Sequence, residues 1–187
     1  MRRLLLSAAL ITACVTPTKT SDVQHLPAPP AVAPPPAPPK LLSFVTQSNP
    51  NLSASEADRI ARLVQQVAEE FKIDVPLFAA IVRQESHFKT GIKACRNMRG
   101  RRTCDYGLAQ VNSFWVDELE LDAKRLRTDY GYNLRIAGKI LRDVLDRHHE
   151  ELGYSFYNTA DTELRLVYSN RIERYRKQAK GLMLAMN

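Results

Sequence analysis

The stretch "DVPLFAAIVRQESHF", from Asp74 to Phe88, is the most informative part of the sequence. Asp74 is suited to cap a helix that starts with Pro76 in its first turn, where a missing N–H is harmless, and that runs to about His87. Glu85 shares one face of this helix with apolar side chains, because residues three, four and seven apart lie on the same side. These side chains are Phe78, Ile81, Val82 and Phe88. The pattern therefore places a carboxylate within an apolar stripe.

A carboxyl group in such a stripe is desolvated, and desolvation favours its neutral form. A carboxylic acid that stays protonated near neutral pH can donate a proton to a leaving oxygen. The alternative is that Glu85 lies at the end of the helix and simply faces solvent. The helix by itself leaves both interpretations open.

The rest of the foldable chain, from about 41 to 187, also has helical patterns, and no segment shows a convincing period-two alternation. Ser53 followed by Glu56 fits a capping box at the start of one helix. Further helices are predicted from about 133 to 145, from about 151 to 158, and from about 162 into 171–178. Gly138 inside a helix indicates close packing of another element. Residues 89 to 130 are expected to be irregular or weakly structured, and a stretch of that length points to function.

Within that region, "TCDYGLAQVNSFW" (Thr103 to Trp115) combines a carboxylate with amide and aromatic side chains. Asp105 either takes part in chemistry or shapes the turn that presents Gln110 and Asn112.

Four motifs together carry a family resemblance: "RQESHF" from Arg83, "DYGLAQVNS" from Asp105, "FYN" from Phe156, and "YSNRI" from Tyr168. Their order and approximate spacing resemble the soluble-lytic-transglycosylase domain over about residues 53 to 178. The chain looks most like the small single-domain lytic transglycosylases, which include those that accompany secretion systems and pili. The resemblance implies a lysozyme-like, mostly α-helical fold of the α+β class, with a groove for alternating amino sugars.

The resemblance also implies roles for individual residues. Glu85 would be the single catalytic acid and base, which cleaves the bond between N-acetylmuramic acid and N-acetylglucosamine in peptidoglycan and closes a 1,6-anhydro ring without a cofactor. The substrate-binding residues would be Ser86, Gln110, Asn112, Tyr157, Asn158 and Tyr168. Each has a plainer alternative: the tyrosines as core residues, Gln110 as a turn residue bonded to its own backbone, and Ser86 as a local backbone partner.

Two positions depart from the family pattern. Ala109 stands where "GLMQ" has methionine, and no glycine closely follows the pair Tyr157 and Asn158. Both departures concern substrate preference more than the reaction.

Two other functions remain as alternatives. "DYGLAQVNSFW" also resembles the segment of c-type lysozymes that bears their second carboxylate, so Asp105 together with Glu85 would make a muramidase, a retaining hydrolase whose carboxyl groups lie about 5 Å apart. The other alternative is a non-catalytic lipoprotein that binds the cell wall.

The N-terminal residues are expected to lie outside the fold. Two arginines and a short apolar run suit a signal peptide over residues 1–13. The sequence up to Cys14 resembles the lipobox of bacterial lipoproteins, which implies lipidation of Cys14 and a membrane anchor. Residues 14–40 would form a lipid-anchored linker, whose thirteen-residue proline-rich part extends to about 40 Å. Val15 after the lipidated cysteine favours the periplasmic face of the outer membrane.

With Cys14 assigned to lipid, Cys95 and Cys104 remain as a disulfide pair in an oxidising compartment. A CxxC spacing is absent, and no metal site is expected. The formal net charge of +7 suits an anionic partner. For an exported chain this indicates the cell wall, and a secretion or pilus machine as a further partner, with no role for nucleic acid. The basic cluster Lys93, Arg96, Arg99, Arg101 and Arg102 is interpreted as a solvated loop.

Overall fold

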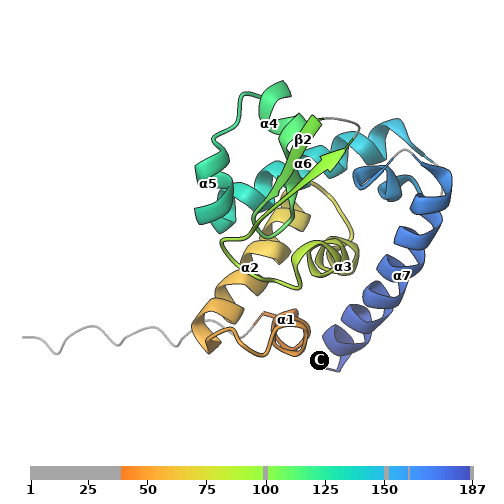
Figure 1. The fold of residues 1–187 in the computed structure, drawn as a ribbon. Helices are drawn as coiled ribbons and strands as arrows, with labels where there is room; N and C mark the ends of the chain where they lie inside the picture. Colours follow the sequence, from red (N-terminus) through yellow and green to blue (C-terminus); the bar gives the residue numbers. More distant parts are fainter. Residues whose placement is uncertain (1–38, 99–100, 150–151, 160, 186–187) are drawn as a thin grey trace, which may run out of the picture. The chain divides into compact units, whose positions relative to one another are not determined.

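The helix predicted around Glu85 lies at the centre of the fold as α3 (Val75–Ser86) (Figure 1). The structure is a computed structural model, and it describes residues 39–98, 101–149, 152–159 and 161–185. Asp74 caps α3, because its side chain accepts a hydrogen bond from the backbone N–H of Leu77. Every side chain from Leu77 to Val82 is buried. A helix that is apolar on all sides needs neighbours all round.

Two helices, α2 (Ala54–Glu70) and α7 (Thr162–Leu184), supply most of those neighbours, and α1 (Leu42–Ser48) and α6 (Tyr130–Arg147) pack around them in turn. The longest of them, α7, packs chiefly against α3, and α2 packs against α1, α3 and α6 (Figure 1). The capping box predicted at the start of α2 is present. The Ser53 side chain accepts a hydrogen bond from the backbone N–H of Glu56, and the Glu56 side chain accepts one from the backbone N–H of Ser53. The molecule is therefore mostly α, as predicted.

Gly138 allows α6 to approach α2 closely, as its place inside a helix predicted. A Cβ atom at this position would lie 2.7 Å from Cγ1 of Val67 and 2.8 Å from Cδ2 of Phe71. Real Cβ atoms essentially never come so near to another atom, so any larger residue would push the two helices apart.

The expectation of an irregular segment over 89 to 130 was wrong. The chain there forms a three-stranded antiparallel sheet in the order β1 (Lys93–Met98), β2 (Arg101–Tyr106), β3 (Val111–Asn112), followed by α4 (Ser113–Glu118) and α5 (Ala123–Thr128). The strands were missed because β1 is exposed and has no apolar face, so its sequence carries no period-two alternation.

Three smaller differences concern helix boundaries. The seven-residue α1 was not predicted, and α6 starts at Tyr130, behind a cap from Asp129, rather than near Asn133. The helix expected from about 151 to 158 is a 3₁₀ helix, η1 (Gly153–Tyr157). Short helices of this kind carry too few turns to show a clear periodicity.

The predicted disulfide between Cys95 and Cys104 is confirmed, and it joins residues directly opposite each other in β1 and β2. The predicted signal peptide, Cys14 and nearly all of the predicted linker lie outside the described residues. Among the helices of the described part, none is long and apolar enough to cross a membrane.

Candidate active site

A groove of about 380 Å³ lies beside the last turn of α3. Side chains from α3, the sheet, α4 and η1 line it. The lining residues are Glu85, Ala94, Arg96, Asp105, Gln110, Val111, Asn112, Phe114, Trp115, Phe156, Tyr157 and Asn158. Polar groups beside flat aromatic rings suit a ligand that offers both hydroxyl groups and apolar faces, as sugars do.

The chain reaches the groove because α3 ends there. His87 caps the helix in the left-handed conformation with φ of 52°, and Phe88 follows with φ of 57°. The side-chain amide of Asn49 donates to the carbonyl of Phe88 at 3.3 Å and holds this reversal in place. Glu85 therefore lies at the end of a buried helix, partly covered and partly open to the groove.

The environment of Glu85 favours its protonated form. The pKa of this carboxyl is raised from its usual 4.5 to about 7, chiefly by burial. The charge of Asp105 also acts to raise it, whereas the hydrogen bond from Tyr168 and the charge of Arg96 act to lower it. The Tyr168 hydroxyl donates to Oε1 of Glu85 at 2.8 Å. An acid with a pKa near 7 is present in both forms at neutral pH, so it can give up a proton and later take one back.

Tyr157 and Tyr168 both belong to this cluster and are both kept neutral. Burial, and then the charge of Glu85, hold the pKa of each phenol well above its usual 10. The Tyr157 hydroxyl donates to the carbonyl of Ala109 at 3.0 Å, which ties η1 to the loop across the groove. Tyr168 orients the acid from α7, and Tyr157 lines the groove.

Asp105 has a hydrogen-bond partner at each carboxylate oxygen. Arg96 donates to Oδ2 at 2.6 Å, and the side-chain amide of Asn112 donates to Oδ1 at 2.5 Å. The carboxyl is almost fully buried, at 7% exposure. A nucleophile must present an oxygen to the sugar, whereas these oxygens hold β1 and β3 to β2. The geometry supports the second of the two roles considered for Asp105, that of shaping this wall.

Gln110 lies in the turn between β2 and β3 and lines the groove. Its side-chain amide donates to the carbonyl of Gly107 at 2.7 Å, and its own backbone is left-handed, with φ of 47°. The turn is also clamped by Asn133 of α6, whose side chain donates to the carbonyl of Tyr106 and accepts from the N–H of Ala109, each at 2.8 Å. Asn133 was not predicted as a site residue, since nothing in its own helix marks it.

The other predicted binding residues fall into different settings. Asn158 is exposed at the edge of the groove. Asn112 lines the groove, but it also caps α4 by accepting from the N–H of Phe114 at 2.9 Å. Ser86 is buried, outside the groove lining, and its hydroxyl donates to the carbonyl of Val82 at 3.3 Å.

Sequence reasoning missed part of the groove wall. Arg96 was interpreted as a loop cation, yet it lines the groove and pairs with Asp105. The neighbouring rings of Phe114 and Trp115, with centroids 5.1 Å apart, were overlooked together with Phe156. The one available signal was the pair of adjacent aromatic residues in the first turn of α4, of which Phe114 is exposed, because solvent-facing rings frequently mark a binding surface.

These features define a class of protein: a mostly α domain with one half-buried carboxylic acid beside a groove suited to sugars. The family model of the transglycosylase SLT domain matches residues 62–175, and the chain belongs to this family. Its fold is accordingly lysozyme-like, and its general function is peptidoglycan degradation of the lytic-transglycosylase type. No curated protein matches the chain.

The described residues also show no cluster of three or more His, Cys, Asp or Glu side chains able to hold a metal ion.

Proposed function

We propose that the protein is a lytic transglycosylase that cleaves the bond from N-acetylmuramic acid to N-acetylglucosamine and leaves a 1,6-anhydro end on the muramic residue. The observation that carries this proposal is the pairing of one half-buried acid, Glu85, whose pKa lies at about 7, with a second carboxylate, Asp105, whose two oxygens are both engaged.

In the first step, protonated Glu85 donates its proton to the glycosidic oxygen, and the bond from that oxygen to C1 of the muramic residue breaks. Tyr168 holds Oε1 of the same carboxyl. The acetamido group of the substrate stabilises the positive charge at C1, so the enzyme needs no carboxylate nucleophile.

In the second step, the Glu85 carboxylate accepts the proton of the C6 hydroxyl. The oxygen of that hydroxyl attacks C1 and closes the anhydro ring. Water is neither consumed nor released, and Glu85 ends the cycle protonated. A pKa of about 7 suits both steps, because neither protonation state is strongly disfavoured at neutral pH.

Mass spectrometry of the fragments released from isolated sacculi tests the proposal. We expect products with 1,6-anhydro ends from the wild-type protein and none from Glu85→Gln. Products with reducing ends, one water heavier, would show a hydrolase instead. Intact sacculi with both proteins would show a protein that binds the wall without cleaving it.

We also propose that Cys14 carries lipid and anchors the enzyme to the periplasmic face of the outer membrane. The support is the order of charged, apolar and small residues before Cys14 and the proline-rich segment after it. Metabolic labelling with a fatty acid, followed by membrane fractionation, tests this: Cys14→Ser should lose the label and leave the outer-membrane fraction. Label retained by Cys14→Ser would exclude this anchor.

A further inference from the structure

A second pocket, of about 250 Å³, adjoins the groove on the hairpin of β1 and β2. Cys95, Arg96, Asn97 and Arg102 line it, and Arg96 also lines the groove. The two cavities therefore have one residue in common. A ligand in the groove and a ligand in this hairpin pocket would both lie against Arg96.

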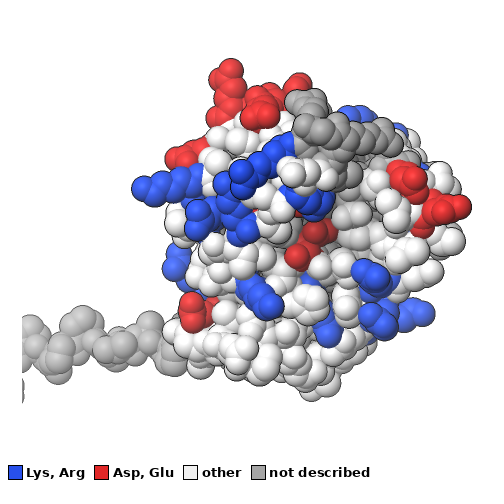
Figure 2. Space-filling model, viewed as in Figure 1, with Lys and Arg blue, Asp and Glu red and all other residues white. Residues whose placement is uncertain are grey.

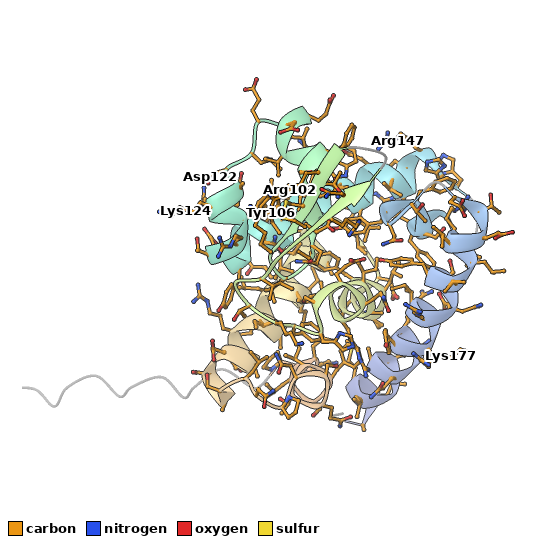
Figure 3. All side chains as sticks on the ribbon, in the orientation of Figure 1. Arg102, Tyr106, Asp122, Lys124, Arg147 and Lys177 are labelled. Atoms are coloured by element: carbon orange, nitrogen blue, oxygen red, sulfur yellow. A yellow bond between two sulfur atoms is a disulfide. The ribbon has the colours of Figure 1, made fainter. Side chains whose placement is uncertain are left out.

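The hairpin pocket is rich in cationic hydrogen-bond donors. Arg102 projects from β2 and is exposed (Figure 3), and Asn97 is its direct partner in β1. The side chain of Arg96 is 56% exposed even though it pairs with Asp105. A guanidinium carries five N–H donors in a planar fork, a geometry that suits a carboxylate.

The groove and the hairpin pocket, which both contact Arg96, differ in the sign of their charged side chains. The groove contains the carboxyl groups of Glu85 and Asp105, whereas Arg96 and Arg102 are the ionisable residues in the lining of the hairpin pocket. Figure 2 shows Lys and Arg side chains gathered over the hairpin, next to a hollow in which acidic atoms are visible. A matching ligand is uncharged over the groove and anionic over the hairpin.

The hairpin pocket is held in shape before any ligand arrives. The disulfide joins Cys95 to Cys104, and the register continues through the pairs Arg96–Thr103 and Asn97–Arg102. The backbone that carries the two arginines is therefore fixed, and only their side chains lose conformational freedom on binding.

We propose that the hairpin pocket binds a carboxylate of the peptide substituents on the glycan strand, with Arg102 and Arg96 as the donors. The proposal rests on the proposed function, because peptidoglycan joins uncharged amino sugars to peptides that bear carboxylates. Arg102 is then a residue that distinguishes peptide-bearing strands from bare glycan, and it takes no part in the chemistry at Glu85.

Binding of the full chain to sacculi tests this, in a Glu85→Gln background that prevents turnover. Three probes are compared: native sacculi, sacculi whose carboxylates have been converted to amides, and sacculi stripped of their peptides. Arg102→Gln should weaken binding to native sacculi about fivefold, which is the upper end for an exposed ion pair, and should leave binding to the other two probes unchanged. Arg127→Gln is the matched control, because Arg127 is exposed on α5 and lines none of these cavities.

An equal loss on all three probes, or no loss on native sacculi, would overturn the proposal. A second combination of results would also overturn it: the protein binds inorganic polyphosphate through Arg102, and amidation of the sacculi has no effect on binding. The pocket would then be a general anion site. The experiment is independent of catalysis. If the wild-type protein released no anhydro products but the pattern of binding held, the proposed reaction would fail and the carboxylate pocket would stand.

Discussion

Replacing Glu85 by glutamine should change the stability of the protein in a pH-dependent way. Below pH 4.5 the carboxyl is protonated in both the folded and the unfolded chain, and glutamine is a close neutral mimic of it. Between pH 4.5 and about 7 the unfolded chain ionises while the folded chain stays protonated. The free energy of unfolding of the wild-type protein therefore falls with rising pH in this interval, and Glu85→Gln escapes that loss.

The size of this change in the free energy of unfolding follows from the two pKa values, one for the unfolded chain and one for the folded chain. The step from 4.5 to about 7, at about 1.4 kcal/mol for each pH unit, corresponds to about 3 kcal/mol. The variant should gain this much over the wild type between pH 4 and pH 8. Comparing the two pH values removes any difference in packing between the two side chains, because packing does not titrate.

Urea denaturation followed by circular dichroism at pH 4 and pH 8 measures the difference. Glu120→Gln serves as the control, since Glu120 is an exposed glutamate. If the difference between Glu85→Gln and the wild type stayed within about 0.5 kcal/mol across this range, Glu85 would titrate as a solvated residue. Burial would then not raise the pKa of this carboxyl.

Three further variants test the surroundings of Glu85 and the turn. Tyr168→Phe removes a hydrogen bond that favours the ionised carboxylate, so the alkaline limb of the activity profile should move to higher pH. Asp105→Asn removes a charge that raises the pKa of Glu85, so the same limb should move to lower pH while activity is retained. Asn133→Ala leaves two buried backbone groups of the turn without partners, and the free energy of unfolding should fall by about 2–4 kcal/mol.

The pH profiles of sacculus solubilisation and urea denaturation are the respective measurements. Shifts of the same sign for Tyr168→Phe and Asp105→Asn would contradict the assigned electrostatics. Complete loss of activity in Asp105→Asn, with its fold intact, would support a muramidase. A loss below about 0.5 kcal/mol in Asn133→Ala would mean that the turn is held by other contacts.

The helical part of the fold was predictable because helical spacing fixes which side chains share a face. The positions of Phe78, Ile81, Val82 and Phe88 placed Glu85 within an apolar stripe, and all four of these side chains are fully buried. The contact from Tyr168 to Glu85 could not come from periodicity, because it spans 83 residues of sequence.

The hairpin and the state of Asp105 could not be predicted from local pattern. The partners of Asp105 lie on β1 and β3, and they reach it only through the antiparallel register that sets Asp105 opposite Asn112. That register is set by strand pairing and by a disulfide. Neither of them requires apolar residues to alternate with polar ones in the sequence of β1, so the sequence gives no sign of the strand. The basic residues of β1 and β2 accordingly looked like a solvated loop until the strands were paired.

Ala109 shows how this wall can tolerate variation. Its N–H is held by Asn133 and its carbonyl by Tyr157, so side chains from α6 and η1 fix both backbone groups of one residue. The side chain of residue 109 is fully buried but has no part in those bonds. Exchange between the methionine of the family pattern and alanine thus changes volume behind the groove without releasing the turn. Position 109 is therefore a site where a change of side-chain volume would press on this wall while the hydrogen bonds that hold the turn stay in place.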